Sequence, residues 1–550
     1  MDDKNNRYLL FALAAVLCFW GINFGLPQAV HADEQAFIKR ALRFSTGDLN
    51  PHFFVYPTLY MYILFAAYGF YYIVNFAAGN FSAPSDFAAA YIRDPSHIYL
   101  IARGIGALCA VLSVYVAYLI GERLYGKKTA LLGGLIFALN ARFIEWSHYA
   151  KSDTAMLLAI MLFFLSCLKI REVGGKKYYI LSGLFMGLAA AFKYNALMLY
   201  PAAIIAHFMP QPFSAITKPA ARRHWLLALS AAFVVVGFTV GMPYWILDFG
   251  TFSRQVAQLV GFLSADTEFG RDLSALAYLK LLVYWGGNTP FLGLMVIAGA
   301  LAVFLRREKS DVLPAAGAFI VFAGCSMQRI AQGQYLLPAL PLFALIAARS
   351  FFVAVEKLKG NRLARYAFTA ALSAALFHSA AVAALDDYAL SQKDIRVLAA
   401  EWIEKNIPEN TKMLVDTYGP RLARSRELLL RQYELASELG HHKKDYFKLQ
   451  LDAQTGKEYR WYQIERPVVN IPEAREYSQI VELNVPLSLG VKQLSKAGFE
   501  YIILSPPMEP TAEEKKLDAE LETVKEFSPA RPVPPLRTRI KIYRLPVVRK

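Results

Sequence analysis

The sequence has few charged residues and few cysteines for its length. Only 19% of its 550 residues are Asp, Glu, Lys or Arg, whereas 56% are hydrophobic, and the mean hydropathy is +0.32. Soluble domains are usually about one quarter charged, so this composition argues against an ordinary cytoplasmic enzyme. The four cysteines stand inside or beside apolar runs without paired spacing, which argues against a disulfide framework and against a zinc site.

Acidic residues are outnumbered by basic ones. The 59 Lys and Arg against 43 Asp and Glu leave a net charge of +16, and much of the excess lies in short clusters between apolar runs. This distribution is typical of a polytopic membrane protein and does not indicate a nucleic-acid partner. Because short loops rich in Lys and Arg are retained in the cytoplasm, five clusters are expected there. They lie at 123–128, 169–177, 218–223, 306–309 and 357–365.

The apolar runs predict an all-α polytopic membrane protein with about eleven transmembrane helices and additional juxtamembrane helices. The expected spans are 8–27, 98–120, 129–145, 154–170, 178–192, 195–209, 225–242, 289–305, 313–326, 335–352 and 366–384. An odd number of spans, starting from a cytoplasmic N-terminus, places the residues after 385 on the outer side. The expected location is the cytoplasmic (inner) membrane.

One further apolar stretch, residues 53–78, does not fit this count, because the segments on both sides of it must be external. Its many Phe and Tyr side chains suit the headgroup level, so we expect it to lie along the outer interface or to dip in and return. The alternative is a hairpin of two spans. The start of the chain also resembles a signal peptide ending at Val30-His31-Ala32, but its apolar run is longer than a typical h-region.

Residues 386–550 have the composition of a soluble domain and are divided from the transmembrane domain, residues 1–385. Helix-like segments alternate in them with short apolar runs, which predicts an extracytoplasmic α/β domain. His441 and His442 are interpreted as solvated loop residues, and no spacing typical of a catalytic motif occurs. The expected helices are 394–406 and 491–497, and the expected strands are 413–416, 501–505 and 540–545.

Two acidic clusters fall on the same side of the membrane in this topology. The loop after the first span holds Asp33 and Glu34. The loop before the span 154–170 holds His148, Lys151 and Asp153. Carboxylates in such positions can coordinate a divalent cation or supply a base to a reaction at the lipid surface. For any one of them, a solvated loop position is the alternative interpretation.

Several basic residues lie near the same side. Lys193 stands at the outer turn between two apolar runs, and Arg103 lies inside the span 98–120. Arg142 and Arg329 fall near external ends of spans. Ionisable groups at membrane depth are costly and are therefore functional candidates. Cations beside carboxylates would hold a phosphate while an acid handles protons; snorkelling to the headgroups is the alternative.

The candidate residues stand in short motifs that are spread over most of residues 1–420. The motifs are His31-Ala-Asp-Glu34, Arg103-Gly-Ile-Gly106, Leu119-Ile-Gly-Glu-Arg-Leu-Tyr-Gly126, the segment Ser147–Asp153, Gly183-Leu-Phe-Met-Gly187-Leu-Ala-Ala-Ala-Phe-Lys193, Gln334-Tyr-Leu-Leu-Pro338-Ala-Leu-Pro341 and the segment Asp394–Pro408. Together they resemble the GT-C class of membrane glycosyltransferases, in particular the bacterial branch of the protein O-mannosyltransferase and aminoarabinose transferase superfamily.

The resemblance implies an inverting enzyme that uses a polyprenyl-phosphate sugar as donor and needs no nucleotide. The implied catalytic residues are Asp33, as base or acceptor-orienting group, with Glu34 beside it, and Asp153. The implied donor-phosphate ligands are Lys193, Arg103 and Arg329. The residues expected in the acceptor or sugar pocket are His148, Lys151 and Tyr335.

The sequence departs from the related families at two points. It lacks the His-Pro-Pro element of the protein O-mannosyltransferases, which weakens the implication of a protein acceptor. Lys151 stands where a D-x-D motif ending at Asp153 would have its first acid. No cofactor is therefore required, although Mg or Mn could bind at Asp33 and Asp153.

The sequence thus predicts transfer of a hexosyl or pentosyl unit from a polyprenyl-phosphate donor to an unidentified glycan, lipid or protein acceptor at the outer face of the membrane. A transporter or flippase of lipid-linked sugars is the first alternative, since broken helices and intramembrane charges would serve it too. A membrane-anchored binding protein that acts through residues 386–550 is the second.

Overall fold

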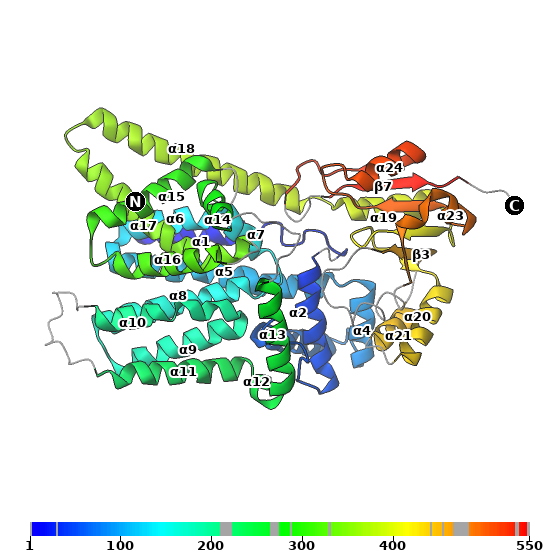
Figure 1. Cartoon of the computed structure of the whole chain (residues 1–550), viewed down its shortest axis with the longest axis horizontal. Helices are drawn as coiled ribbons and strands as arrows, with labels where there is room; N and C mark the ends of the chain where they lie inside the picture. Colours follow the sequence, from blue (N-terminus) through cyan, green and yellow to red (C-terminus); the bar gives the residue numbers. More distant parts are fainter. Residues whose placement is uncertain are drawn as a thin grey trace. The chain divides into compact units, whose positions relative to one another are not determined.

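The computed structural model describes most of the chain (Figure 1). The described residues are 3–28, 31–209, 223–264, 274–285, 289–327, 332–439, 443–453, 456–465, 483–533 and 538–546. They form two compact units, which we call the helical unit and the sheet unit. The helical unit comprises residues up to 22, 33–67 and 101–387, and the sheet unit comprises 23–32, 68–100 and the residues from 388 onward.

The helical unit is built almost entirely from helices. Its first half contains α1 (Asp3–Phe19), α2 (Ala32–Arg43), η1 (Phe44–Thr46), α3 (Leu59–Ala77), α5 (Ser96–Tyr125), α6 (Lys127–Ala138), α7 (Ala141–Ser147), α8 (Asp153–Glu172) and α9 (Lys176–Phe192). Its second half contains η2 (Tyr194–Leu199), α10 (Pro201–Phe208), α11 (Trp225–Gly241), α12 (Tyr244–Leu247), α13 (Phe249–Ser264), α14 (Ser274–Val283), α15 (Pro290–Arg306), α16 (Val312–Ser326), η3 (Gly333–Ala339), α17 (Leu340–Lys357) and α18 (Arg362–Ser391). The end of α3, the start of α5 and the end of α18 belong to the sheet unit.

Five helical segments of the described chain are long and apolar enough to cross a membrane. They are Leu59–Ala77, Ser96–Tyr125, Asp153–Glu172, Gly333–Lys357 and Arg362–Asn406. Shorter apolar helices cover Asn5–Phe19, Trp225–Gly241, Pro290–Arg306 and Val312–Ser326. These helices confirm the predicted polytopic helical class, whereas the number of crossings stays a prediction.

Two of the expected spans are interrupted. Helix α1 ends at Phe19, because Gly21 and Gly25 adopt positive φ angles that a right-handed helix cannot contain. The expected span 129–145 is divided into α6 and α7. Asn140 caps the second of these helices, since its side chain accepts a hydrogen bond from the Phe143 N–H.

The structure excludes two of the arrangements considered for the aromatic stretch 53–78. Helix α3 runs unbroken over the 19 residues Leu59–Ala77, so the stretch neither dips in and returns nor forms a hairpin of two spans, while a position along the outer interface stays a prediction. Helix α3 contains no proline and only Gly69 as a flexible residue, so nothing in it reverses the chain. A helix of this length is sufficient to cross a bilayer.

Glycines allow α9 and α11 to pack backbone against backbone. A methyl group at Gly183 would lie 2.1 Å from the Ser230 carbonyl oxygen, and one at Gly187 would lie 2.2 Å from that of Val234. Small residues commonly permit such close approach between membrane helices. The tight contact fixes the end of α9, and therefore the position of the residue that follows it, Lys193.

The sheet unit contains a seven-stranded mixed sheet with strand order β2-β3-β1-β5-β7-β6, and β4 pairs with β3. The strands are β1 (Lys412–Val415), β2 (Ala423–Arg424), β3 (Glu458–Ile464), β4 (Asn484–Val485), β5 (Tyr501–Leu504), β6 (Glu522–Phe527) and β7 (Ile540–Arg544). The helices are α4 (Pro84–Arg93), α19 (Ile395–Asn406), α20 (Arg426–Glu438), α21 (Lys444–Ala453), η4 (Leu487–Leu489), α23 (Gly490–Lys496) and α24 (Ala512–Glu520). Neighbouring pairs involving β1 to β4 are parallel, whereas β7 runs antiparallel to β5 and β6.

Both faces of this sheet are covered, because alternate residues of a strand point to opposite sides. Met413 and Val415 pack on one face in a cluster that includes Ile403 of α19. Leu414 packs on the other face with Leu517 of α24. The expected α/β organisation and the expected helices and strands are therefore confirmed, while His441 and His442 lie outside the described residues.

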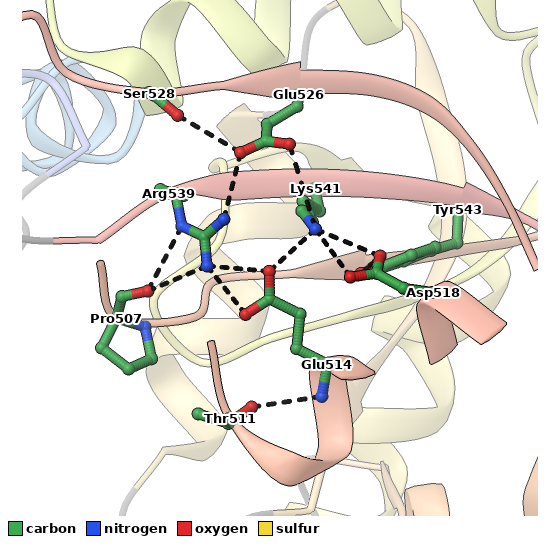
Figure 2. Close-up of polar contacts among 9 residues, drawn as sticks. All are labelled: Pro507, Thr511, Glu514, Asp518, Glu526, Ser528, Arg539, Lys541 and Tyr543. Carbon is green, nitrogen blue, oxygen red and sulfur yellow. Dashed lines mark hydrogen bonds and ion pairs between the residues drawn. The ribbon is translucent and has the colours of Figure 1, made fainter. Parts of the chain in front are cut away.

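An ion-pair network joins α24 to strands β6 and β7 (Figure 2). The Glu514 carboxylate is fully buried and lies 2.8 Å from both Arg539 Nη2 and Lys541 Nζ. Arg539 also contacts Glu526, and Lys541 also contacts Asp518. Because both cations are nearly buried, each depends on these carboxylates for compensation.

Removing the shared carboxylate should open this edge of the sheet. We expect Glu514→Ala to lower the free energy of local opening of β7 by about 3 kcal/mol, since it leaves two nearly buried cations undercompensated. Amide hydrogen exchange of the β7 residues measures this change. Glu522→Ala, on the exposed face of β6, is the matched control and should leave the exchange rates unchanged.

Candidate active site

The site residues expected from the sequence come from four separate parts of the helical unit. Asp33 and Glu34 lie in the first turn of α2, where the helix dipole favours carboxylates. Lys151 lies in the loop before α8, and Asp153 is the first residue of α8. Lys193 follows α9, and Tyr335 lies in η3.

Arg103 and Glu34 form a buried bidentate ion pair. Arg103 donates from Nε and Nη2 to the two Glu34 oxygens, each at 2.8 Å, and from Nη1 to the Ile22 carbonyl oxygen at 2.7 Å. The Ala150 N–H donates to the same carboxylate at 2.8 Å. Both charged side chains have zero exposure. The pair therefore ties α2, α5 and the loop before α8 together.

This geometry does not fit the roles expected for these two residues. A guanidinium whose Nε and both terminal nitrogens donate to protein groups, and which has no exposed surface, cannot bind a donor phosphate as expected for Arg103. Glu34 is equally enclosed and cannot meet an acceptor. Their positions in the sequence indicate that both ionisable groups are important, but the sequence does not show that they neutralise each other.

Lys151 pairs with Asp33. Its Nζ lies 2.6 Å from Asp33 Oδ2, and it lies 4.4 Å from the centre of the Trp146 ring. The Lys151 side chain is 5% exposed, whereas that of Asp33 is 37% exposed. Asp33 is therefore the more accessible member of the pair.

Lys193 pairs with Asp153. Its Nζ lies 2.5 Å from Asp153 Oδ1 and 4.8 Å from the centre of the Tyr335 ring. Burial lowers the pKa of Lys193, and the adjacent Asp153 carboxylate opposes that effect. The paired carboxylate thus compensates an ammonium group that would otherwise be costly to bury.

The two ion pairs belong to one cluster, which we call the Lys–Asp cluster (Asp33, Lys151, Asp153 and Lys193). The charges of Lys151 and Asp33 both act on Lys193. The phenol of Tyr56 hydrogen-bonds to Asp33 and also lies within the fields of Asp153 and Tyr335; burial and these carboxylates raise its pKa. The structure therefore brings the two distant acids together with Lys193.

Neither Tyr56 nor Arg40 was singled out from the sequence as a site residue. Tyr56 is part of the aromatic stretch 53–78 and was assigned to the membrane interface with its neighbours. The Arg40 guanidinium lies 3.5 Å from the centre of the Phe53 ring, and burial lowers the pKa of Arg40 to about 10. The sequence offers little to identify these two residues, since it shows only that an arginine and a tyrosine follow the motif that contains Asp33.

Other expected residues lie elsewhere or are not described. Arg329 lies outside the described residues. Arg142 pairs with Glu145 at 2.6 Å. His148 does not join the Lys–Asp cluster: its Nε2 lies 3.8 Å from Asp387 Oδ1 of α18. Its ring is 1% exposed, and its assignment to a sugar pocket stays a prediction.

The expected metal ligands each have a lysine as partner. In the part of the chain that the structure describes, no group of three or more His, Cys, Asp or Glu side chains is arranged to hold a metal ion. Two carboxylates that are already neutralised by ammonium groups are a poor donor set for a hard divalent cation. Binding of Mg or Mn at Asp33 and Asp153 stays a prediction.

Removing one partner of the buried ion pair should destabilise the protein. Glu34→Ala leaves the Arg103 guanidinium buried without its carboxylate, which should cost roughly 3–5 kcal/mol. Thermal unfolding of the purified protein in detergent measures the loss. Glu172→Ala, which removes an exposed pair with Arg123 and Lys169, is the control and should have little effect. If Glu34→Ala unfolded like wild type but lost activity, the structural role would be wrong.

Comparisons with known proteins agree with this architecture. Residues 99–246 match the family model described as dolichyl-phosphate-mannose-protein mannosyltransferase. No curated protein sequence matches the chain. The crystal structure of ArnT from Cupriavidus metallidurans in the apo state is similar, with a TM-score of 0.54 and 15% identity over 100% of both chains. ArnT bound to undecaprenyl phosphate has a TM-score of 0.50 and 14% identity over 99% of both chains.

The matched segment 99–246 includes three residues of the Lys–Asp cluster, and the structural likeness extends over the whole chain. At these identities the likeness to ArnT shows the fold. The chain therefore has the fold of ArnT and, with its match to the mannosyltransferase family model, is similar to the membrane glycosyltransferases of the GT-C class.

Proposed function

We propose that this protein is an inverting glycosyltransferase that takes a sugar from a polyprenyl-phosphate donor and passes it to an acceptor at the outer face of the inner membrane. The observation that carries the proposal is the Lys–Asp cluster, in which two lysines and two carboxylates from distant segments meet beside Tyr56 and Tyr335. A solved structure with the same fold binds undecaprenyl phosphate, which supports a lipid-phosphate donor.

The cluster supplies the groups that such a transfer needs. The bond between sugar C1 and the phosphate oxygen breaks as the bond from C1 to the acceptor oxygen forms, and the proton of the acceptor hydroxyl passes to a carboxylate. Asp33 is the more exposed of the two carboxylates, so it is the base in this proposal. Lys193 stabilises the departing phosphate, since its ammonium group is already held in a water-poor site.

The two ion pairs also keep the cluster close to neutral before substrate binds. Two ammonium groups are matched by two carboxylates, which limits the cost of burying each of them. When the donor phosphate contacts Lys193, it competes with Asp153 for the same cation. Lys151, which lies against Asp33 and Trp146, orients the base. Tyr56 donates a second hydrogen bond to the same carboxylate.

The location at the outer face rests on the distribution of basic loops. The five basic clusters are expected in the cytoplasm, and the Lys–Asp cluster lies at the other ends of helices that carry them. Helix α8, for example, begins at Asp153 and ends beside Lys169 and Arg171, and α9 begins at Lys176 and ends before Lys193. The cytoplasmic N-terminus and external C-terminal domain belong to the same proposal.

Replacing the proposed base should slow transfer without unfolding the protein. We expect Asp33→Asn to lower kcat by about 10²–10⁴-fold, the usual effect of losing a general base. The assay incubates the purified protein with polyprenyl-phosphate sugars and with glycan, lipid or peptide acceptors in turn, and measures the free lipid phosphate released. Asp445→Asn, an exposed carboxylate of α21, is the matched control and should retain activity.

Replacing the phosphate-binding lysine should affect both donor binding and turnover. We expect Lys193→Ala to raise the donor KM and to lower kcat about 100-fold or more, because a preorganised charge on the leaving group is lost. Lys448→Ala, an exposed lysine of α21, serves as control. Variants of Asp33 and Lys193 that both match wild type would disprove the site, and lipid-sugar movement without release of lipid phosphate would indicate a flippase.

A further inference from the structure

The loop that carries Lys151 and Asp153, residues 148–153, is held at several points. Glu34 binds the Ala150 N–H. Helix α5 approaches the loop so closely at Gly106 that an added methyl group would lie 3.0 Å from the Tyr149 carbonyl oxygen. A further contact lies at the first residue of the loop, His148, and it involves α18, a helix from the far end of the helical unit's sequence.

His148 faces Asp387 of α18 inside the helical unit. Both side chains are 1% exposed, and His148 Nε2 lies 3.8 Å from Asp387 Oδ1. The backbone of Leu17 and Trp20 also lies beside the imidazole ring. Among the described residues, neither carboxylate oxygen of Asp387 accepts a hydrogen bond. The imidazole is therefore one donor-bearing side chain next to this buried carboxyl group, and the Cys18 thiol also lies within the field of Asp387.

A carboxyl group in this position requires a partner. Burial disfavours its charged form, and a buried carboxyl group in either form costs free energy unless it is hydrogen-bonded, so the position of Asp387 is informative. Burial and the nearby Arg103 charge lower the pKa of His148 to about 4, which leaves the ring neutral near pH 7. A neutral imidazole has one N–H to donate, and a separation of 3.8 Å is bridged by a slight closure or by one water.

We propose that Asp387 and His148 form a positioning pair, in which the carboxyl group on α18 and the imidazole share a hydrogen bond that holds the 148–153 loop in its active geometry. Neither residue touches the reacting atoms. The pair acts through Lys151 and Asp153, three and five residues after His148. This inference rests on the proposed function, because those two residues belong to the Lys–Asp cluster.

The kinetic signature of such a pair is specific. A displacement of about 1 Å in a positioned group can cost up to about 100-fold in rate, so kcat should fall when the loop is released. Lys193 and Tyr335 lie on other segments, so the donor KM should change little. Replacing a residue that only supports the fold would lower the unfolding temperature. It would not lower kcat while leaving the donor KM unchanged.

The test compares four variants of the full-length protein. We expect Asp387→Ala and His148→Ala each to lower kcat about 10- to 100-fold, with the donor KM within about 3-fold of wild type. The double variant should be no slower than the slower single variant, because both changes break one contact. Asp387→Asn should recover most of kcat, since its amide oxygen can still accept the hydrogen bond.

Other outcomes overturn the proposal. A hydrogen-bonded positioning pair is excluded if the single variants retain the kcat of wild type. It is also excluded if the two losses multiply in the double variant, or if Asp387→Asn is as slow as Asp387→Ala. Asp445→Asn, an exposed carboxylate of α21, is the control and should behave like wild type.

A second measurement separates this inference from the proposed function. The same four variants are compared by thermal unfolding, where a direct interaction makes the two single effects non-additive. If wild type released no lipid phosphate from any polyprenyl-phosphate sugar, the proposed function would fail while this coupling remained measurable. Additive unfolding effects would overturn the pair whether or not the enzyme assay succeeds.

Discussion

The buried ion pair between Arg103 and Glu34 is the interaction on which the candidate site depends. It is a bidentate contact without solvent exposure, and its carboxylate also receives the Ala150 N–H. Because both charges are removed from water, each is tolerated only while the other is present. The pair consequently fixes the start of α2 relative to α5 and to the loop before α8. These are the segments that present Asp33, Lys151 and Asp153.

Beside this ion pair, each lysine of the Lys–Asp cluster has an aspartate as its partner. Lys151 and Lys193 each lie within ion-pair distance of one aspartate, and Tyr56 adds a hydrogen bond to the more exposed carboxylate. Such an arrangement holds cations ready in a water-poor region at limited cost. A phosphate group that enters the site meets an ammonium group whose orientation is already set. The chemistry proposed for the protein follows from this preorganisation.

The helical class and the elements of the C-terminal sheet could be predicted because each depends on local patterns. Apolar runs long enough for a bilayer, and short apolar runs between helix-like segments, are visible in the sequence. The interruptions could not be predicted in the same way. Asn140 caps α7 and thereby divides one apolar run into two helices. Hydropathy averaged over a window of residues does not detect this single polar residue. The aromatic content of α3 suggested an interface, but aromatic side chains do not determine whether a helix turns back.

The sequence by itself determined the kind of protein and the ionisable residues worth examining, since buried or membrane-embedded charges are rare enough to be informative. It could not determine which charge meets which, because pairing depends on side chains from segments that are distant in the chain. Only the tertiary structure shows which charged residues are accessible. Arg103 and Glu34 neutralise each other without solvent exposure, whereas Asp33 and Lys193 retain exposed surface. The same packing turned His148 toward Asp387.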